Sequence, residues 1–253
     1  MDTLNPDHTD IPPVNLEQIM LRGDTWRGEF PMVESETGLN TGYTALNDAL
    51  VSNGWPNKGL IEVCQQGFCQ QEWYLFAPAL KEIDGLIVLL NPPLIPFAHG
   101  LIITGVDLER VRIVRSSRAE DFIASFVELC RTSACSSVFA WQQDLRLTYT
   151  DLRKCLLAAN DGRGLYSLFR SAGAQQQSSP ASLRILLSLQ SDDILVNIFK
   201  QRGMLQGDKL VKLPLPSDAE AMLPYHLLDL YEFDGTVMRP KPKAPVISIR
   251  GRK

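Results

Sequence analysis

The sequence is poor in the residue types that bind metal ions or act as paired nucleophiles. Its three histidines lie far from one another and from the five cysteines, which form no C-x-x-C pair. Their spacing suggests no Ser/His/Asp or Cys/His arrangement. The cysteines lie in apolar segments, which favours small buried side chains in a reducing compartment, with a zinc site as the alternative. These residues are His8, His99, His226, Cys64, Cys69, Cys130, Cys135 and Cys155.

Long apolar runs and a strong net charge are also absent. No apolar run approaches the ~20 residues that a membrane-spanning helix needs. The opening "MDTLNPDHTDIPP" is too acidic and polar for a signal peptide. The formal net charge is only −4, so bulk charge does not argue for nucleic-acid binding. We therefore expect a cytoplasmic protein without membrane contact.

Prolines and charge divide the chain into three parts. With 253 residues, 45% of them hydrophobic and 21% charged, it fits one large soluble domain with extensions, or two small ones. We interpret residues 1–30 as a leader and N-terminal arm, and residues 31–203 as the core. Residues 204–253 mix prolines, apolar clusters and charge, so we expect a partly disordered C-terminal tail.

Apolar runs that alternate with helical periods predict the elements of the core. In residues 119–131, for example, Phe122, Phe126 and Cys130 share one helix face. Further helices are predicted at residues 43–50, 70–83 and 150–160. Strands are predicted at residues 60–64, 86–90, 111–114, 137–141, 165–169, 183–189 and 194–199.

This alternation indicates an α/β fold. Short, wholly apolar strands between amphipathic helices favour a mostly parallel sheet that is covered on both faces. The last two predicted strands have no helix between them, which predicts an antiparallel extension at one edge of the sheet.

The order and spacing of these segments resemble the recombinase family typified by RecA. The segment "TGYTALNDALVSNGWPNKGLIEV" resembles the start of that family's core, and "NPPLIPFAHGLIITGVDLERVRIV" resembles the segment after its second strand. The resemblance implies a RecA-like core of the P-loop NTPase type, with a mostly parallel sheet flanked by helices and an antiparallel edge extension.

A closer resemblance within that superfamily is to the ImuA family. Its motifs here are Trp26-Arg27-Gly28, Asn40-Thr41-Gly42, Gly54-Trp55-Pro56 and the block from Pro92 to Leu108. The later block "LRKCLLAANDGRGLYSLFRS" fits this family and also resembles the cell-division inhibitor SulA. No single motif is decisive, so the resemblance rests on the ordered set.

The ImuA resemblance implies an accessory or regulatory protein of the DNA damage (SOS) response that assembles or regulates error-prone translesion DNA synthesis. Implied partners are an ImuB-type polymerase homologue, an error-prone replicative-type DNA polymerase and RecA, with association with the nucleoid during DNA damage. SulA-like inhibition of cell division through FtsZ is the alternative, and a residual ATPase or recombinase is the third. Direct DNA binding stays open.

The stretch "CQQGFCQQEWY" stands in the place of the phosphate-binding loop but lacks its chemistry. A working loop needs glycines, a lysine for the phosphates and a Ser/Thr hydroxyl for Mg²⁺. If the first strand covers residues 59–63, the last of these positions falls at Glu72, which would repel the γ-phosphate. The degenerate loop consists of Gln65, Gln66, Gly67, Gln70, Gln71 and Glu72.

The acidic positions of a nucleotide site are substituted as well. The second strand should end in the acid that orients water but ends in Asn91, and "SVFAW" should end in a metal-binding aspartate but ends in Trp141. Asp144, three residues further on, is an alternative metal ligand. We predict no ATP hydrolysis, no catalytic residue, no cofactor and no metal, with nucleotide binding without hydrolysis as the alternative, so function must be sought in surfaces.

Three regions outside this site are candidates for partner binding. Tryptophan and arginine near the N-terminus are favoured interface anchors, residues 225–233 fit an amphipathic helix, and the basic tail suits DNA or an acidic partner. The alternatives are an arm or helix packed on the protein's own core, and a solubilising tail. The predicted partner-binding residues are Trp26, Arg27, Gly28, Leu227, Leu228, Leu230, Tyr231, Arg239, Lys241, Lys243, Arg250, Arg252 and Lys253.

Overall fold

The computed structural model describes residues 37–65, 71–190, 193–203, 208–214, 231–233 and 238–240. All of them lie in Ser35–Lys253, the second of the two units into which the chain divides. The predicted leader and N-terminal arm, residues 1–30, lie outside the described residues.

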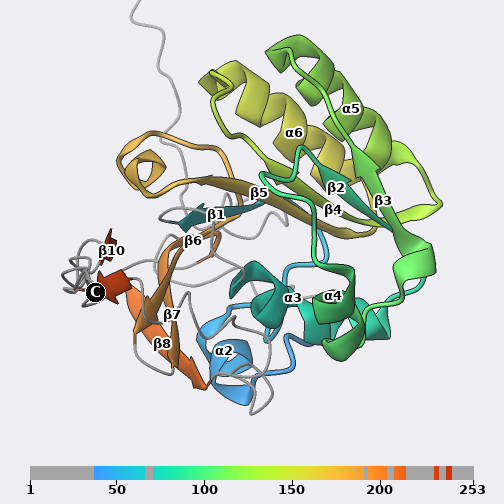
Figure 1. Cartoon of the computed structure of the whole chain (residues 1–253). Helices are drawn as coiled ribbons and strands as arrows, with labels where there is room; N and C mark the ends of the chain where they lie inside the picture. The colour runs from blue at the N-terminus through green and yellow to red at the C-terminus, as the bar shows by residue number, and fades with distance from the viewer. Residues whose placement is uncertain are drawn as a thin grey trace, which may run out of the picture. The chain divides into compact units, whose positions relative to one another are not determined.

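An eight-stranded sheet forms the centre of this unit (Figure 1). Its strand order is β3-β2-β4-β5-β1-β6-β7-β8, parallel from β3 to β6 and antiparallel from β6 to β8. The strands are β1 (Ile61–Gln65), β2 (Leu86–Leu90), β3 (Val111–Val114), β4 (Cys135–Trp141), β5 (Leu165–Ser171), β6 (Leu183–Gln190), β7 (Asp193–Gln201) and β8 (Lys209–Pro214). A separate antiparallel pair joins β9 (Tyr231–Phe233) and β10 (Met238–Pro240).

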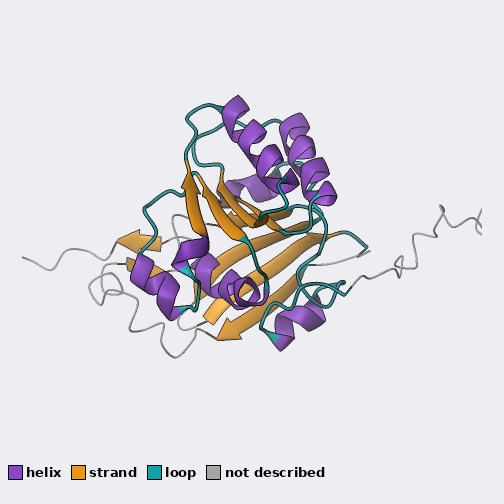
Figure 2. Cartoon of the chain, turned by 90° about the vertical axis from the view of Figure 1, so that its right-hand side faces the viewer, coloured by secondary structure: helices purple, strands orange, loops and turns teal. Residues whose placement is uncertain are grey.

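Helices cover both faces of the sheet (Figure 2). One hydrophobic cluster joins the sheet to α2 and α3, and a second joins it to α5 and α6. The helices are α2 (Thr44–Ala49), α3 (Gln71–Glu82), α4 (Ala98–Ile103), α5 (Ala119–Arg131) and α6 (Tyr149–Asp161), with 3₁₀ turns η1 (Leu108–Arg110) and η2 (Ala172–Gln176). The prediction of a mostly parallel sheet flanked by helices, with an antiparallel edge, is confirmed.

Local chemistry explains where the two long helices α5 and α6 begin. Thr148 accepts a hydrogen bond from the Asp151 backbone N–H, and the Asp151 carboxylate accepts one from the Thr148 backbone N–H. This reciprocal cap satisfies backbone groups that the first turn of α6 leaves free. In α5, Glu120 and Asp121 lie in the first turn and Arg131 in the last, where each charge is favoured by the helix dipole.

Helix α4 and strand β8 were not predicted from the sequence, and neither were the short strands β9 and β10. The six-residue helix α4 follows three prolines and has no side-chain cap, so local signals for it are weak. Strand β8 pairs with β7 along its whole length, so the sheet continues past residue 203, where we placed the end of the core. Its apolar residues alternate over only six positions, and the pairing with β7 stabilises them.

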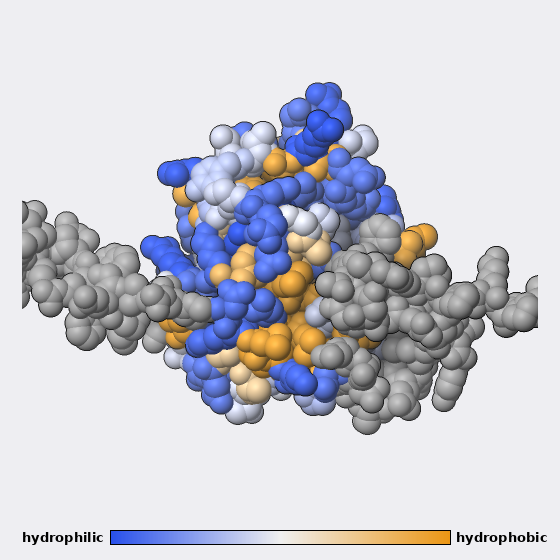
Figure 3. All heavy atoms as spheres, turned by 90° about the vertical axis from the view of Figure 1, so that its left-hand side faces the viewer, coloured by the Kyte–Doolittle hydropathy of each residue, from blue (hydrophilic) through white to orange (hydrophobic). Residues whose placement is uncertain are grey.

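Strand β8 forms one edge of the sheet. Val211 and Leu213 are buried, whereas Leu210 and Lys212 are exposed. Figure 3 shows the face on the side of this edge, where apolar residues gather in the lower half between polar ones. Exposed lysines on a short edge strand oppose unwanted pairing with further strands.

Candidate functional site at the carboxyl ends of the strands

Strands β1, β2, β4 and β5 are parallel neighbours in the sheet, so their carboxyl ends lie at the same end of the strands. Gln65, Asn91 and Trp141 lie there, and Glu72 follows in the first turn of α3. The structure thus describes four of the predicted positions. Gln66, Gly67 and Gln70 lie outside the described residues, and for Gln71 only the backbone is described.

Glu72 is a carboxylic acid in an apolar environment. Only 6% of the residue is exposed, and burial raises the pKa of its carboxyl group to about 7. Its own backbone N–H and the Trp141 indole N–H lower this pKa in part. No described basic side chain forms an ion pair with it, and its Oε2 has no hydrogen-bond partner. Glu72 is therefore a buried acid whose proton is lost near neutral pH.

Trp141 fills the end of β4 with an aromatic ring. It is 5% exposed and stacks on Phe169 with ring centroids 4.7 Å apart and an interplanar angle of 14°. Its Nε1 has no hydrogen-bond partner of normal geometry among the described residues. An indole in this place contributes apolar contact area, and it lines a cavity together with Glu72, whose pKa its N–H lowers.

Asn91 fixes a neighbouring loop and does not face Glu72. Its Nδ2 donates to the Ser116 carbonyl at 2.8 Å, and its Oδ1 accepts from the Ser116 N–H at 2.7 Å. Gln143 Nε2 donates to the Asn91 carbonyl at 2.6 Å. Asn91 also adopts φ +53°, a conformation that asparagine tolerates better than most residues. These contacts indicate a structural role for this position.

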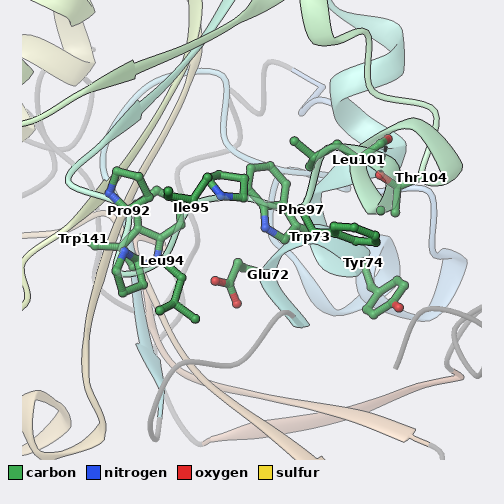
Figure 4. A pocket seen from close by; sticks show the side chains of 13 residues that line it. Glu72, Trp73, Tyr74, Pro92, Leu94, Ile95, Phe97, Leu101, Thr104 and Trp141 are labelled. Carbon is green, nitrogen blue, oxygen red and sulfur yellow. Dashed lines mark hydrogen bonds between the residues drawn. The ribbon is translucent and has the colours of Figure 1, made fainter. Parts of the chain in front are cut away.

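A small cavity lies between α3 and the segment that follows β2 (Figure 4). Its volume is about 100 Å³. In Figure 4 the Glu72 carboxylate lies beside Leu94. The cavity is lined by Glu72, Trp73, Tyr74, Pro92, Pro93, Leu94, Ile95, Pro96, Phe97, Gly100, Leu101, Thr104 and Trp141.

A buried ionic network lies on β1, β5 and β6 and was not predicted. Arg184 donates to the Glu62 carboxylate at 2.6 and 2.9 Å, and Arg170 Nη1 lies 3.3 Å from the same carboxylate. Ser179 donates to its other oxygen. In the sequence, each of these three strands carries a charged residue among mainly apolar ones. A charged residue in such a place is rarely buried without a partner, so this pattern is the signal for the network.

Arg170 links this network to the strand ends. Its Nε donates to Gln142 Oε1 at 2.6 Å and its Nη2 to Gln177 Oε1 at 2.7 Å. Arg170 and Gln65 also line a second cavity of about 220 Å³. The Gln65 side chain is buried and its Oε1 lacks a partner in the described part of the chain.

The remaining predicted residues are the alternative metal ligand Asp144 and the five cysteines. Asp144, the alternative metal ligand, is exposed, and the residues that the structure describes hold no cluster of three or more metal-ligating side chains. Four cysteines are buried and free, as expected, and Cys69 lies outside the described residues. No helix in the described ranges has the length and apolar character needed to cross a membrane.

Most predicted partner-binding residues lie outside the described residues. Tyr231 begins β9, not the expected amphipathic helix, because residues 231–233 pair with β10. Arg239 lies in β10. The residues outside the described ranges are Trp26, Arg27, Gly28, Leu227, Leu228, Leu230, Lys241, Lys243, Arg250, Arg252 and Lys253.

The sheet and its helices define the chain as a mixed α/β protein, and comparisons with known proteins do not assign it to a family. No protein-family profile and no curated protein matches it. Among solved structures, the chain is similar to SulA from Pseudomonas aeruginosa, with 19% identity and a TM-score of 0.35. That similarity covers 44% of this chain and 97% of SulA. It is too low to indicate a function.

Proposed function

We propose that this protein is a non-catalytic accessory protein of the DNA damage response that acts by binding other proteins. The observation that carries the proposal is Glu72. The resemblance to RecA-type proteins places Glu72 where a Ser/Thr hydroxyl would hold Mg²⁺, and here the residue is only 6% exposed and burial raises the pKa of its carboxyl group. A group in that state is poorly suited to metal and phosphate chemistry.

Neighbouring positions support the same proposal. Asn91 is engaged with Ser116, and Trp141 stacks on Phe169, so neither supplies a carboxylate for water or metal. A RecA-like core that has lost ATP hydrolysis and needs no cofactor would still offer surfaces to partners. The mixed sheet with its antiparallel edge is compatible with such a core.

The partners we propose follow from the ImuA resemblance. They are an ImuB-type polymerase homologue, an error-prone replicative-type DNA polymerase and RecA, met in the cytoplasm and at the nucleoid during DNA damage. In this role the protein assembles or regulates translesion synthesis. Residues 40–42, 54–56, 92–108 and 152–171 carry the part of the resemblance that falls within the described residues.

Inhibition of cell division through FtsZ is the second candidate function. It is favoured by the block from Leu152 to Ser171, which resembles SulA as well as ImuA. In the structure this block covers most of α6 and all of β5, so it contributes to the sheet and the core more than to an exposed surface. We therefore rank it second.

A pull-down with purified RecA, the ImuB-type protein, the polymerase and FtsZ tests the proposal. We expect the full chain to retain at least one of the first three, and to release no phosphate from ATP above the background of a buffer control. Retention of FtsZ alone would favour the second candidate. ATP turnover that is lost in Gln71→Ala or Glu72→Gln would show an enzyme and overturn the proposal.

A further inference from the structure

Exposed apolar side chains gather in one short stretch of the described chain. Ten large apolar residues in the described ranges are exposed, and five of them lie between residues 94 and 103. They belong to the segment before α4 and to α4 itself. We call these five the α4 surface: Leu94 (61% exposed), Ile95 (82%), Phe97 (62%), Ile102 (55%) and Ile103 (40%). Apolar residues grouped in this way mark interaction sites more often than scattered ones do.

The α4 surface adjoins the cavity at Glu72. Leu94, Ile95 and Phe97 form part of both, and Pro92, Pro93 and Pro96 restrict the backbone of this segment. The cavity volume is about 100 Å³, well below the ~300–1,000 Å³ of sites that enclose small-molecule ligands. It suits a single side chain.

The lining of the cavity includes a buried acid, Glu72, beside the indole N–H of Trp141, which lowers the pKa of that acid. Within the described ranges, Glu72 Oε2 has no hydrogen-bond partner of normal geometry, although only 6% of the residue is exposed. Two basic residues of this region have other contacts. Arg115 donates to the Pro92 carbonyl, and the His99 ring lies against Phe97. A buried acceptor left without a partner costs free energy that an incoming donor would recover.

We propose that the α4 surface binds a segment of a partner protein that presents large apolar side chains around one lysine or arginine. The basic side chain enters the cavity and its charged end pairs with the Glu72 carboxylate. Its aliphatic stem lies along Trp73 and Leu94, while the flanking apolar side chains cover Ile95, Phe97 and Ile102. The inference rests on the proposed partner-binding function and assigns it a surface.

The chemistry of the two sides is complementary in this arrangement. Long basic side chains combine an apolar stem with a charged end, so they match a cavity with apolar walls and an acidic base. Binding hot spots of protein interfaces combine such features, because surrounding apolar contacts shield an ion pair from water. Without such a partner, burial disfavours the charged form of Glu72.

Peptide display on the full-length protein tests this inference. Random peptides are selected on the wild type and counter-selected on Ile95→Asp, which alters an 82% exposed side chain. We expect the recovered peptides to carry a lysine or arginine among large apolar residues. Replacing that basic residue by norleucine should weaken binding at least about thirtyfold, and Glu72→Gln should weaken the original peptide to a similar extent.

Two controls separate the surface from general effects. Leu210→Asp changes an apolar residue of β8 that is 62% exposed, and it should leave peptide binding unchanged. In Glu72→Gln, the norleucine replacement should have little further effect, because the two changes remove the same contact. Urea unfolding of each variant shows that the fold is retained.

Several results would overturn the inference. The first is a library that yields no peptide whose binding depends on Ile95. The second is a set of recovered peptides without a lysine or arginine. The third is a Glu72→Gln variant that binds the selected peptide as tightly as the wild type does. A photo-crosslinker at Ile95 that reacts within the chain or with a second copy would show a different occupant. If Ile95→Asp still retains the partner in the pull-down, the proposed function stands and this surface is not where the partner binds.

Discussion

Arg184 donates two hydrogen bonds to one carboxylate oxygen of Glu62, from Nε at 2.9 Å and from Nη2 at 2.6 Å. Their side chains are 7% and 0% exposed, and Arg170 brings a second guanidinium to the same carboxylate. One acid therefore balances two buried cations. The network joins β1 to both neighbouring strands, so it holds the centre of the sheet in register.

Removing the Glu62 carboxylate should strongly lower the stability of the fold. Glu62→Gln leaves Arg170 and Arg184 without a counter-charge, and we expect a loss of about 3–5 kcal/mol in the free energy of unfolding, measured by urea denaturation. Glu128→Gln is the matched control, because its pair with Arg131 is exposed at 76% and 56%. That change should stay within about 0.5 kcal/mol. Equal effects of the two would contradict the prediction.

The pH dependence of stability should report on Glu72. Its pKa rises from an ordinary 4.5 to about 7 in the folded protein. The folded state thus binds this proton more tightly than the unfolded chain, so the contribution of Glu72 to stability falls as pH rises from about 4.5 to 7. We expect Glu72→Gln to gain stability over the wild type across this window by on the order of 3 kcal/mol.

The measurement is the urea midpoint of both proteins from pH 4 to 8. Other groups titrate in both proteins, so they cancel in the difference between the two curves. Parallel curves across the window would show that Glu72 has an ordinary pKa.

Asn91 should contribute to the stability of the fold in two separate ways, through its backbone conformation and through its side-chain hydrogen bonds. Both Asn91→Ala and Asn91→Gly remove the two bonds to Ser116, each worth about 0.5–1.5 kcal/mol. Glycine accepts φ +53° freely, whereas alanine adds a further penalty of about 1–2 kcal/mol. Thermal unfolding should rank wild type above Gly and Gly above Ala. A glycine variant less stable than the alanine variant would contradict this.

Gly42 lets the turn before α2 approach α3 closely. A Cβ at Gly42 would lie 2.3 Å from Pro78 Cβ, and the residue adopts φ +82°. Gly42→Ala should therefore cost about 2–4 kcal/mol through strain and overpacking. Gly173→Ala is the control, since a Cβ there meets nothing within 4 Å. The prediction fails if both variants unfold at the same urea concentration.

Elements with strong local patterns were predicted well from the sequence. The helix at residues 119–131 has the predicted bounds, because its apolar residues recur every three or four positions and its end charges suit a helix. Strand β2 also has its predicted bounds. Helix α4 and strand β8 were missed, because the first follows prolines without a cap and the second depends on its pairing with β7.

The candidate site was predicted as a set of positions, not as an arrangement. The sequence placed Asn91 and Trp141 at the ends of strands and Glu72 at the start of the helix after the first strand, and the structure has all three in these places. It did not indicate that Glu72 and Trp141 share a cavity while Asn91 turns to Ser116. Side-chain direction at a strand end depends on the loop that follows, and such loops carry no periodic pattern.

By itself, the sequence determined the alternation of strands and helices, the burial of four cysteines and the absence of phosphate-loop chemistry at residues 70–72, because these follow from local residue types and spacing. Only the tertiary structure decided that Glu62 pairs with Arg184, 122 residues away, and that an apolar surface lies beside the buried Glu72. Such contacts depend on which strands become neighbours in the sheet, and the local period of a strand does not specify its neighbour.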